Sequence, residues 1–112
     1  MLPMPAPSLC VAAALEACDL HIDDFVSPRK HVRLIRCRQI AAWLIRTRTL
    51  ASTVEAAKAI GRSNHSTICT IHRRVEQLIQ KQDPSFQADF AAAEQRLNEM
   101  LQHKLEASPC SF

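Results

Sequence analysis

Apolar residues recur every three to four positions through most of the chain, which is the period of an α-helix rather than of a β-strand. Residues 8–18 predict a first helix with Ser8 as its N-cap. Residues 22–26 predict a short helical turn, and the Ser27-Pro28 pair that follows ends it. The residues of this turn that are predicted to point inward are Ile22, Phe25 and Val26.

A longer helix is predicted over residues 34–47, after a basic loop at residues 29–33. The positions that approximate one helical face are 35, 40, 43, 44 and 47. Arg36, Gln39 and Arg46 fall off that face. Trp43 lies on it and is therefore expected to be a core residue rather than a platform on which bases stack.

Two helices around the only glycine of the chain form the most informative local pattern. Ser52 and Glu55 match a capping box, which predicts the start of a short helix that runs almost to Gly61. The glycine can adopt the left-handed conformation that ends helices. A second helix begins within three residues, with Ser63 or Asn64 as its cap. A longer second helix with a polar start is typical of a helix-turn-helix.

A last helix is predicted over residues 84–107, with Asp83 as its N-cap and Pro84 at its first position. Its apolar residues lie on one face: Phe86, Phe90, Ala93, Leu97, Leu101 and Leu105. Two interpretations of this face stay open. It packs back on the rest of the domain, or it binds a protein partner or a second copy of the chain.

Length and composition narrow the class of protein. The 112 residues suffice for one compact domain and exclude a TIM barrel, and no apolar run approaches the ~20 residues of a membrane span. The five cysteines are odd in number and form no CxxC pair, which argues against a disulfide framework and a metal site. We expect a disordered leader at residues 1–7, a DNA-binding domain at 8–81, and a helix and tail at 82–112.

The distribution of charge along the chain is the strongest indication of the kind of partner that the protein binds. Residues 1–28 carry a net charge of −4, residues 29–74 carry +10, and residues 75–112 carry −3. A basic block between acidic flanks suits a polyanion, because each neutralised phosphate releases counterions. The alternative is a solvated surface that happens to be basic.

Four segments within residues 20–80 are specific enough to compare with known families. They are Ile22-Asp23-Asp24-Phe25, Arg36-Cys37-Arg38-Gln39-Ile40-Ala41, Ser52-Thr53-Val54-Glu55 and Gly61-Arg62-Ser63-Asn64-His65-Ser66-Thr67-Ile68. Together they resemble the C-terminal DNA-binding domain (domain IV) of the bacterial replication initiator DnaA. The last segment is similar to the family signature, which typically reads Gly-Gly-Arg-Asp-His-Thr-Thr-Val. The resemblance implies an all-α, Trp-repressor-like helix-turn-helix bundle, here free-standing and with an extra C-terminal helix.

The resemblance also implies a set of DNA-binding residues. The signature opens the recognition helix, so Asn64, His65, Ser66 and Thr67 would face bases and phosphates beside Arg62 and Ser63. Lys30 matches a minor-groove arginine of the basic loop, and Arg29 and Arg33 lie beside it. The positions that match contacts to the DNA backbone are Gln39, Arg46, Thr49 and Ser52. Arg38 matches a family arginine whose role is phosphate binding or local structure.

General chemistry agrees with this assignment, since small polar side chains at a helix N-terminus can approach base edges while free amides meet phosphate. Three departures from the family pattern bear on specificity. Asn64 replaces an aspartate and can donate as well as accept a hydrogen bond, Ser63 replaces an arginine, and Lys30 lacks the fork of an arginine. Cys37 also replaces a proline. The preferred sequence is therefore expected to differ from the usual DnaA box.

The functional expectation is sequence-specific binding of double-stranded DNA that regulates replication initiation or transcription. A chain with one glycine has no Gly-rich phosphate loop, so we expect no nucleotide, cofactor or ATPase activity. No catalytic arrangement is expected either, and the predicted location is the cytoplasm, on the nucleoid. The alternative hypothesis is a protein-interaction adaptor that uses the helix at 84–107 and only tethers to DNA non-specifically.

Overall fold

Helices make up all the regular secondary structure in the computed structural model, which describes residues 4–62 and 64–107. In chain order they are α1 (Pro7–Cys18), α2 (Ile22–Phe25), α3 (Val32–Arg48), α4 (Thr53–Ala59), α5 (His65–Gln80) and α6 (Pro84–Ala107). The all-α prediction is confirmed. No helix in the described ranges is long and apolar enough to cross a bilayer. Ser63, the start of the predicted leader and the predicted tail beyond residue 107 lie outside the described residues.

Two helices, α1 and α3, begin earlier than the sequence predicted. Ser8 lies inside α1 rather than capping it, because Pro7 occupies the first turn, where its fixed φ and missing N–H cost nothing. Helix α3 begins at Val32, so it takes up the end of the predicted basic loop. Its N-cap is His31, whose Nδ1 accepts a hydrogen bond from the Arg33 amide at 3.3 Å.

The short α2 buries less than its sequence suggested. Phe25 is fully buried, whereas Ile22 and Val26 are 43% and 41% exposed. The three positions are spaced i, i+3 and i+4 and share one side of a helix, but α2 is a single turn and only Phe25 lies in the core. The prediction that all three residues face the core was therefore wrong for two of them.

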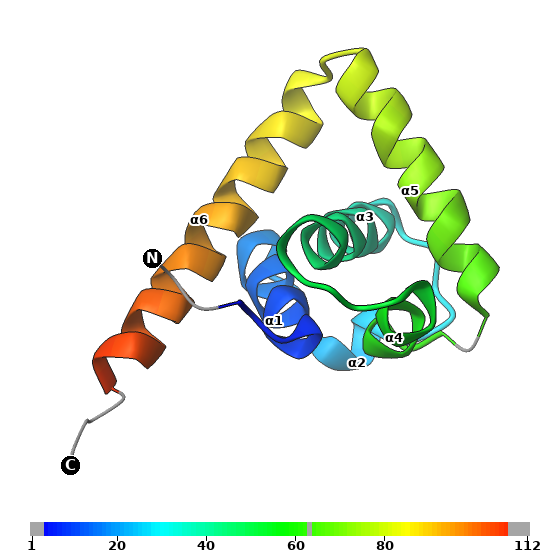
Figure 1. The fold of residues 1–112 in the computed structure, drawn as a ribbon. Helices are drawn as coiled ribbons and strands as arrows, with labels where there is room; N and C mark the ends of the chain where they lie inside the picture. The colour runs from blue at the N-terminus through cyan, green and yellow to red at the C-terminus, as the bar shows by residue number, and fades with distance from the viewer. Residues whose placement is uncertain (1–3, 63, 108–112) are drawn as a thin grey trace.

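Helix α3 is the centre of the fold and contacts each of the other five helices (Figure 1). Its buried residues consequently surround the helix instead of forming one stripe. They are Leu34, Cys37, Arg38, Gln39, Ile40, Ala41, Ala42, Leu44 and Ile45. This explains why the predicted face was wrong at Ile35 and Thr47, which are exposed, and why Gln39 is buried although it was expected off the apolar face.

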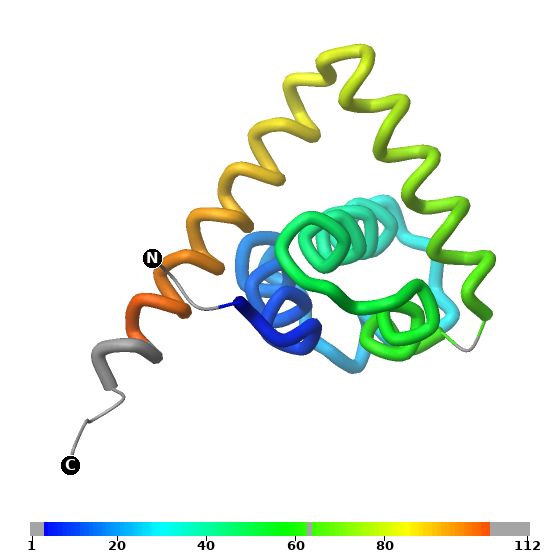
Figure 2. Tube along the Cα trace, in the orientation of Figure 1, coloured from blue at the N-terminus to red at the C-terminus, as the bar shows by residue number. Residues whose placement is uncertain are grey.

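Helices α5 and α6 form a V that opens around the other helices, with α6 running beside α1 (Figure 1). The tube in Figure 2 follows the sharp turn between them. Asp83 caps α6 as predicted, since its Oδ1 accepts hydrogen bonds from the amides of Ser85 and Phe86 at 2.9 and 3.1 Å. One face of α6 is buried in the core through Phe86, Ala93, Leu97 and Leu101. The side chain of Leu105 lies outside the described part.

Ion pairs along both edges of α6 complement this apolar contact. Arg36 of α3 lies 3.0 Å from Asp89, and Arg48 of α3 lies 3.5 Å from Glu94. Arg96 of α6 in turn donates to Glu16 of α1 at 2.6 Å. Of the two interpretations left open by the sequence, the structure supports the first: α6 packs on the domain.

We predict that Leu97→Ala lowers the free energy of unfolding by about 2–5 kcal/mol, because the fully buried side chain leaves a cavity between α6 and the core. The matched control is Leu50→Ala, since Leu50 is 87% exposed and its truncation should change stability by about 0.5 kcal/mol or less. Urea unfolding measures both. Equal effects of the two substitutions would contradict the packing of α6.

A buried histidine lies between α3 and α5. The Nε2 atom of His72 is 3.4 Å from the carbonyl oxygen of Ala42, and its ring meets Trp43 edge-on with centroids 5.9 Å apart. Burial lowers the pKa of His72 below the ordinary histidine value of 6.5, and nearby Arg46 lowers it further. The half-buried Trp43 therefore packs against protein, as its position on the predicted face suggested.

We predict that the protein loses stability as the pH falls below about 6.5, because unfolded chains bind a proton at His72 that the folded protein resists. The contribution is fully present above that pH. In His72→Gln this part of the pH dependence should disappear, whereas His103→Gln, at an exposed site on α6, should retain it. Urea midpoints measured at about pH 7.5 and 5.5 would test this. The same pH slope in both variants would exclude His72 as the cause.

Candidate nucleic-acid interface

The first half of the helix-turn-helix follows the predicted local signals. Ser52 Oγ accepts the Glu55 amide at 3.1 Å, and Glu55 Oε1 accepts the Ser52 amide at 3.0 Å, which completes the capping box. After α4, Gly61 adopts a φ of +78°. This lets the Arg62 amide turn back and donate to the carbonyl of Ala57 at 2.7 Å.

Gly61 is also a point of close approach between two distant segments. A Cβ atom at this position would lie 2.8 Å from the Cβ of Val26, which follows α2. Real side chains do not approach so closely, so only glycine fits. The turn of the helix-turn-helix is therefore packed directly on the segment that leads into the basic loop.

The N-terminus of α5 is polar and exposed. Asn64 is its cap, since the Asn64 Oδ1 atom accepts the amide of Ser66 at 2.9 Å and the hydroxyl of Ser66 at 2.8 Å. His65 and Ser66 are exposed, and Thr67 is half-buried. The structure thus places side chains of the predicted recognition helix where a DNA groove could reach them.

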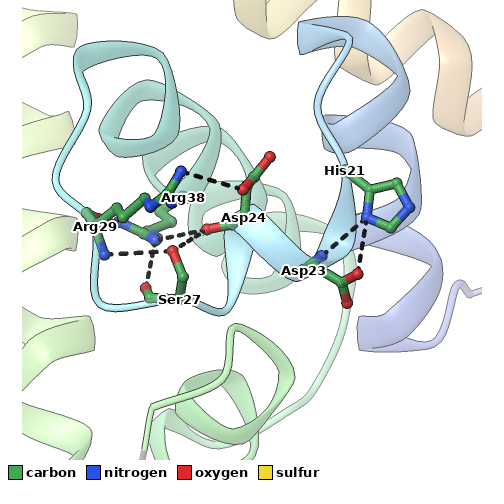
Figure 3. A network of polar contacts seen from close by, with 6 residues as sticks. All are labelled: His21, Asp23, Asp24, Ser27, Arg29 and Arg38. Carbon is green, nitrogen blue, oxygen red and sulfur yellow. Dashed lines mark hydrogen bonds and ion pairs between the residues drawn. The ribbon is translucent and has the colours of Figure 1, made fainter.

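The loop between α2 and α3, residues 26–31, has its backbone fixed by Arg38 (Figure 3). This side chain is only 6% exposed, and its guanidinium donates to four carbonyl oxygens. Those belong to Phe25 at 2.9 Å, Arg29 at 2.7 Å, Ser27 at 2.8 Å and Asp24 at 3.3 Å. Of the two roles that the resemblance allowed for Arg38, this geometry supports local structure.

Arg62 makes a second connection to the same loop. Its Nη1 atom donates to the Val26 carbonyl at 3.2 Å, and its Nη2 atom donates to the Ser27 carbonyl at 3.1 Å. The Ser27 oxygen therefore receives both guanidinium groups. Burial, together with the charge of Arg62, lowers the pKa of Arg38. The basic loop and the helix-turn-helix are consequently held as one unit, a role for Arg62 that sequence reasoning missed.

The loop presents two cations to solvent. The side chains of Arg29 and Lys30 are exposed, and Arg29 lies 3.8 Å from the carboxylate of Asp24. Asp24 and Ser27 shape this loop as well, because the Ser27 hydroxyl donates to the Asp24 carbonyl at 2.6 Å (Figure 3). In the first turn of α3, the exposed Arg33 donates to the carbonyl of Cys18.

The remaining candidates lie along α3 and before α4. Arg46 is exposed, lies 3.6 Å from Glu76 of α5 and covers the ring of Trp43. Thr49 is half-buried and donates its hydroxyl to the Ile45 carbonyl at 2.6 Å. Ser52 is exposed at the cap of α4. Gln39, in contrast, is largely buried at the edge of a cleft that lies between α3 and the meeting point of α5 and α6.

The basic block is therefore divided between two tasks. Arg38 and Arg62 hold the loop and Arg36 and Arg48 hold α6, while the exposed Arg33 and Arg46 make single contacts with the Cys18 carbonyl and the Glu76 carboxylate. Sequence reasoning assigned the whole block to a polyanion because these partners lie up to 53 residues away. The exposed members outside the two groups are Arg29, Lys30, Arg33, Arg46, Lys58, Arg73 and Arg74.

The chain was compared with known proteins. A family model described as the bacterial DnaA protein helix-turn-helix matches residues 10–75, more than half of the chain. The chain belongs to this family. Its helix-turn-helix is a domain that binds double-stranded DNA, so the coarse functional expectation holds. The match ends within α5, and α6 lies beyond it.

Curated relatives share the same region. The chromosomal replication initiator protein DnaA of Rhodopseudomonas palustris (strain TIE-1) is 30% identical over 76 residues, which cover 68% of this chain and 16% of that protein. DnaA of Nitrobacter hamburgensis is 34% identical over 58 residues, or 52% of this chain and 12% of that protein. The chain thus spans about a sixth or less of the curated relatives it matches.

We predict that Gly61→Ala destabilises the domain by about 2 kcal/mol or more, because an alanine resists a positive φ and its Cβ would overlap Val26. The double variant Gly61→Ala/Val26→Ala should recover part of this loss, since it removes the Val26 Cγ1 atom, 2.9 Å from the new Cβ. A double-mutant cycle of urea unfolding measures the coupling. Strictly additive effects would show that the turn and the loop are not in contact.

Proposed function

We propose that this domain reads DnaA-box-like sites in double-stranded DNA. The observation that carries the proposal is the juxtaposition of an exposed polar helix start with a rigid basic loop. His65 and Ser66 project from the N-terminus of α5, and the loop bearing Lys30 is fixed to the preceding turn through Arg38 and Arg62. Such an arrangement suits one helix in the major groove and one cation in the adjacent minor groove.

The hydrogen bonds that cap α5 determine which atoms of Asn64 are left to contact DNA. Its Oδ1 atom already accepts two hydrogen bonds from Ser66, so the side-chain amide N–H groups are what remains for DNA. They would donate to a base acceptor such as N7 or O6 of a purine or O4 of thymine. The aspartate typical of the family accepts hydrogen bonds only. We therefore expect this chain to prefer a different base at that position.

The other contacts divide by chemistry. We assign base-edge contacts to His65 and Ser66 and minor-groove contact to Lys30. Phosphate and sugar contacts are assigned to Arg29, Arg33, Gln39, Arg46, Thr49, Ser52, Ser63 and Thr67, whereas the Arg62 guanidinium donates to the loop carbonyls. Arg38 acts through the loop, because its donors are occupied by carbonyl oxygens inside the protein. Phosphate contacts position the domain, and base contacts select the site.

We further propose that occupancy of such sites regulates replication initiation or transcription without ATP hydrolysis by this chain. The relatives that share the domain are named chromosomal replication initiator proteins. The 112 residues contain a single glycine and hence no Gly-rich phosphate loop. The domain would thus contribute binding alone, by occupying or shielding boxes that an initiator also recognises.

The position of α6 favours this proposal over the adaptor hypothesis. An adaptor would need the apolar face of α6 for its partner, but Phe86, Leu97 and Leu101 on that face are buried in the core. We propose residues 8–81 as the part that contacts DNA and the helix after residue 81 as its brace.

The test is a selection from random duplexes followed by competition between the selected site and a scrambled one. His65→Ala and Ser66→Ala should each cost about 1–3 kcal/mol on the selected site and little on scrambled DNA, because base contacts are lost. Arg46→Ala should weaken binding to both DNAs alike, because a phosphate contact carries no sequence information. Asn64→Asp, which retains the cap, should change the selected base.

The matched control is His103→Ala, which removes an exposed histidine from α6. The C-terminal end of α6 lies far from the N-terminus of α5 (Figure 1). It should leave both affinities unchanged. An unchanged ratio of selected to scrambled binding in His65→Ala and Ser66→Ala would refute the assignment of α5 as the recognition helix. Binding that does not weaken with added salt would refute the phosphate contacts as well.

A further inference from the structure

A cleft of about 480 Å³ lies between the end of α1, one side of α3 and the region where α5 and α6 meet. Cys18, the last residue of α1, lines it together with Arg33 and Arg36 of α3. Cys18 is half-buried, so its thiol is open to small molecules that enter the cleft. Two arginines beside an accessible thiol favour its reactive thiolate form.

A second thiol lies directly behind the first. Arg33 donates to the carbonyl of Cys18, which fixes the end of α1 on the first turn of α3. Cys37 comes four residues after Arg33, one helical turn along the same side of α3, and is fully buried. The side chains of Cys18 and Cys37 interact across this contact. The pair therefore spans the contact between α1 and α3, with one member open to the cleft and the other shielded.

The electrostatics give the two thiols different roles. The hydrogen bond from Cys37 is the largest cause that lowers the pKa of Cys18, and Arg33 and Arg36 act in the same direction against burial and Asp89. The same hydrogen bond and burial raise the pKa of Cys37, which keeps its proton. Burial likewise raises the pKa of Cys10, to about 11.

We propose that Cys18 and Cys37 form a redox-active dithiol that hydroperoxides oxidise to a disulfide joining α1 to α3. The Cys18 thiolate attacks one oxygen of the peroxide and breaks the O–O bond, giving a sulfenic acid and releasing hydroxide or alkoxide. The Cys37 sulfur then displaces the sulfenic hydroxyl. The S–S bond forms, and the proton of Cys37 leaves with that hydroxyl as water. The two thiols supply the two electrons that reduce the peroxide.

The proposed dithiol is separate from the residues proposed to read bases. It uses neither the N-terminus of α5 nor Lys30, although its cleft shares Arg33 and Gln39 with the residues assigned to phosphate. A thiolate nucleophile in an accessible cleft with a resolving cysteine next to it is the arrangement that distinguishes redox-sensing thiols from inert buried ones.

The experiment treats the full-length folded protein with increasing hydrogen peroxide, blocks the remaining thiols with iodoacetamide and digests with trypsin and a glutamate-specific protease. Cleavage after Glu16 separates Cys10 from Cys18, and each of the five cysteines then lies in its own peptide. The expected product is a Cys18–Cys37 cross-linked peptide, accompanied by the loss of two of the five thiols. Cys69, which is exposed on α5, should stay reduced at the same dose of peroxide and should therefore be alkylated by iodoacetamide.

Three variants complete the test. Cys69→Ser should form the cross-link as the wild type does. In Cys37→Ser and Cys37→Ala the cross-link should be absent and a sulfenic acid at Cys18 should be trapped by a cyclic 1,3-diketone, with circular dichroism confirming the helical fold. The proposal is overturned if Cys18 oxidises no faster than Cys69, if it pairs with a cysteine other than Cys37, or if it proceeds to the sulfinic acid while Cys37 stays reduced.

Discussion

A single carbonyl oxygen, that of Ser27, joins the two halves of the proposed DNA-binding surface. The guanidinium groups of Arg38 and Arg62 both donate to it, one from the central helix and one from the turn of the helix-turn-helix. Two cations side by side repel each other, and burying one of them costs solvation. The loop carbonyls offset these costs by accepting the donated hydrogen bonds. Together with the packing of Gly61 against Val26, this clamp fixes the loop's cations relative to α5.

The arginines of the central block show how one residue type serves opposite purposes. At Arg38 and Arg36 the guanidinium contacts a carbonyl or a carboxylate of the protein and holds two segments together. Where no such group closes over it, the same side chain remains available for phosphate. A formal charge of +10 therefore overstates the potential that the domain presents to DNA, since several of those charges are neutralised or shielded within the fold.

What the sequence predicted well was local. The capping box at Ser52, the left-handed glycine and the start of α6 depend on neighbours within a few residues, and each is present. The clamp on Ser27 and the contact between Gly61 and Val26 depend on segments 11 to 35 residues apart, which no periodicity encodes. The same limit explains the misjudged face of α3, because its burial is set by five partners whose positions the pattern of one helix does not specify.

Because α6 packs on the core, the part of the chain that must fold together is longer than the part that matches the family. Residues 10–75 carry the family likeness, yet the inner face of α1 is completed by a helix that begins at Pro84. A fragment cut at the limit of the likeness would expose the apolar groove that Phe86 and Leu97 fill and would be prone to aggregate. Any recombination event that moves this DNA-binding module intact must therefore carry its bracing helix with it.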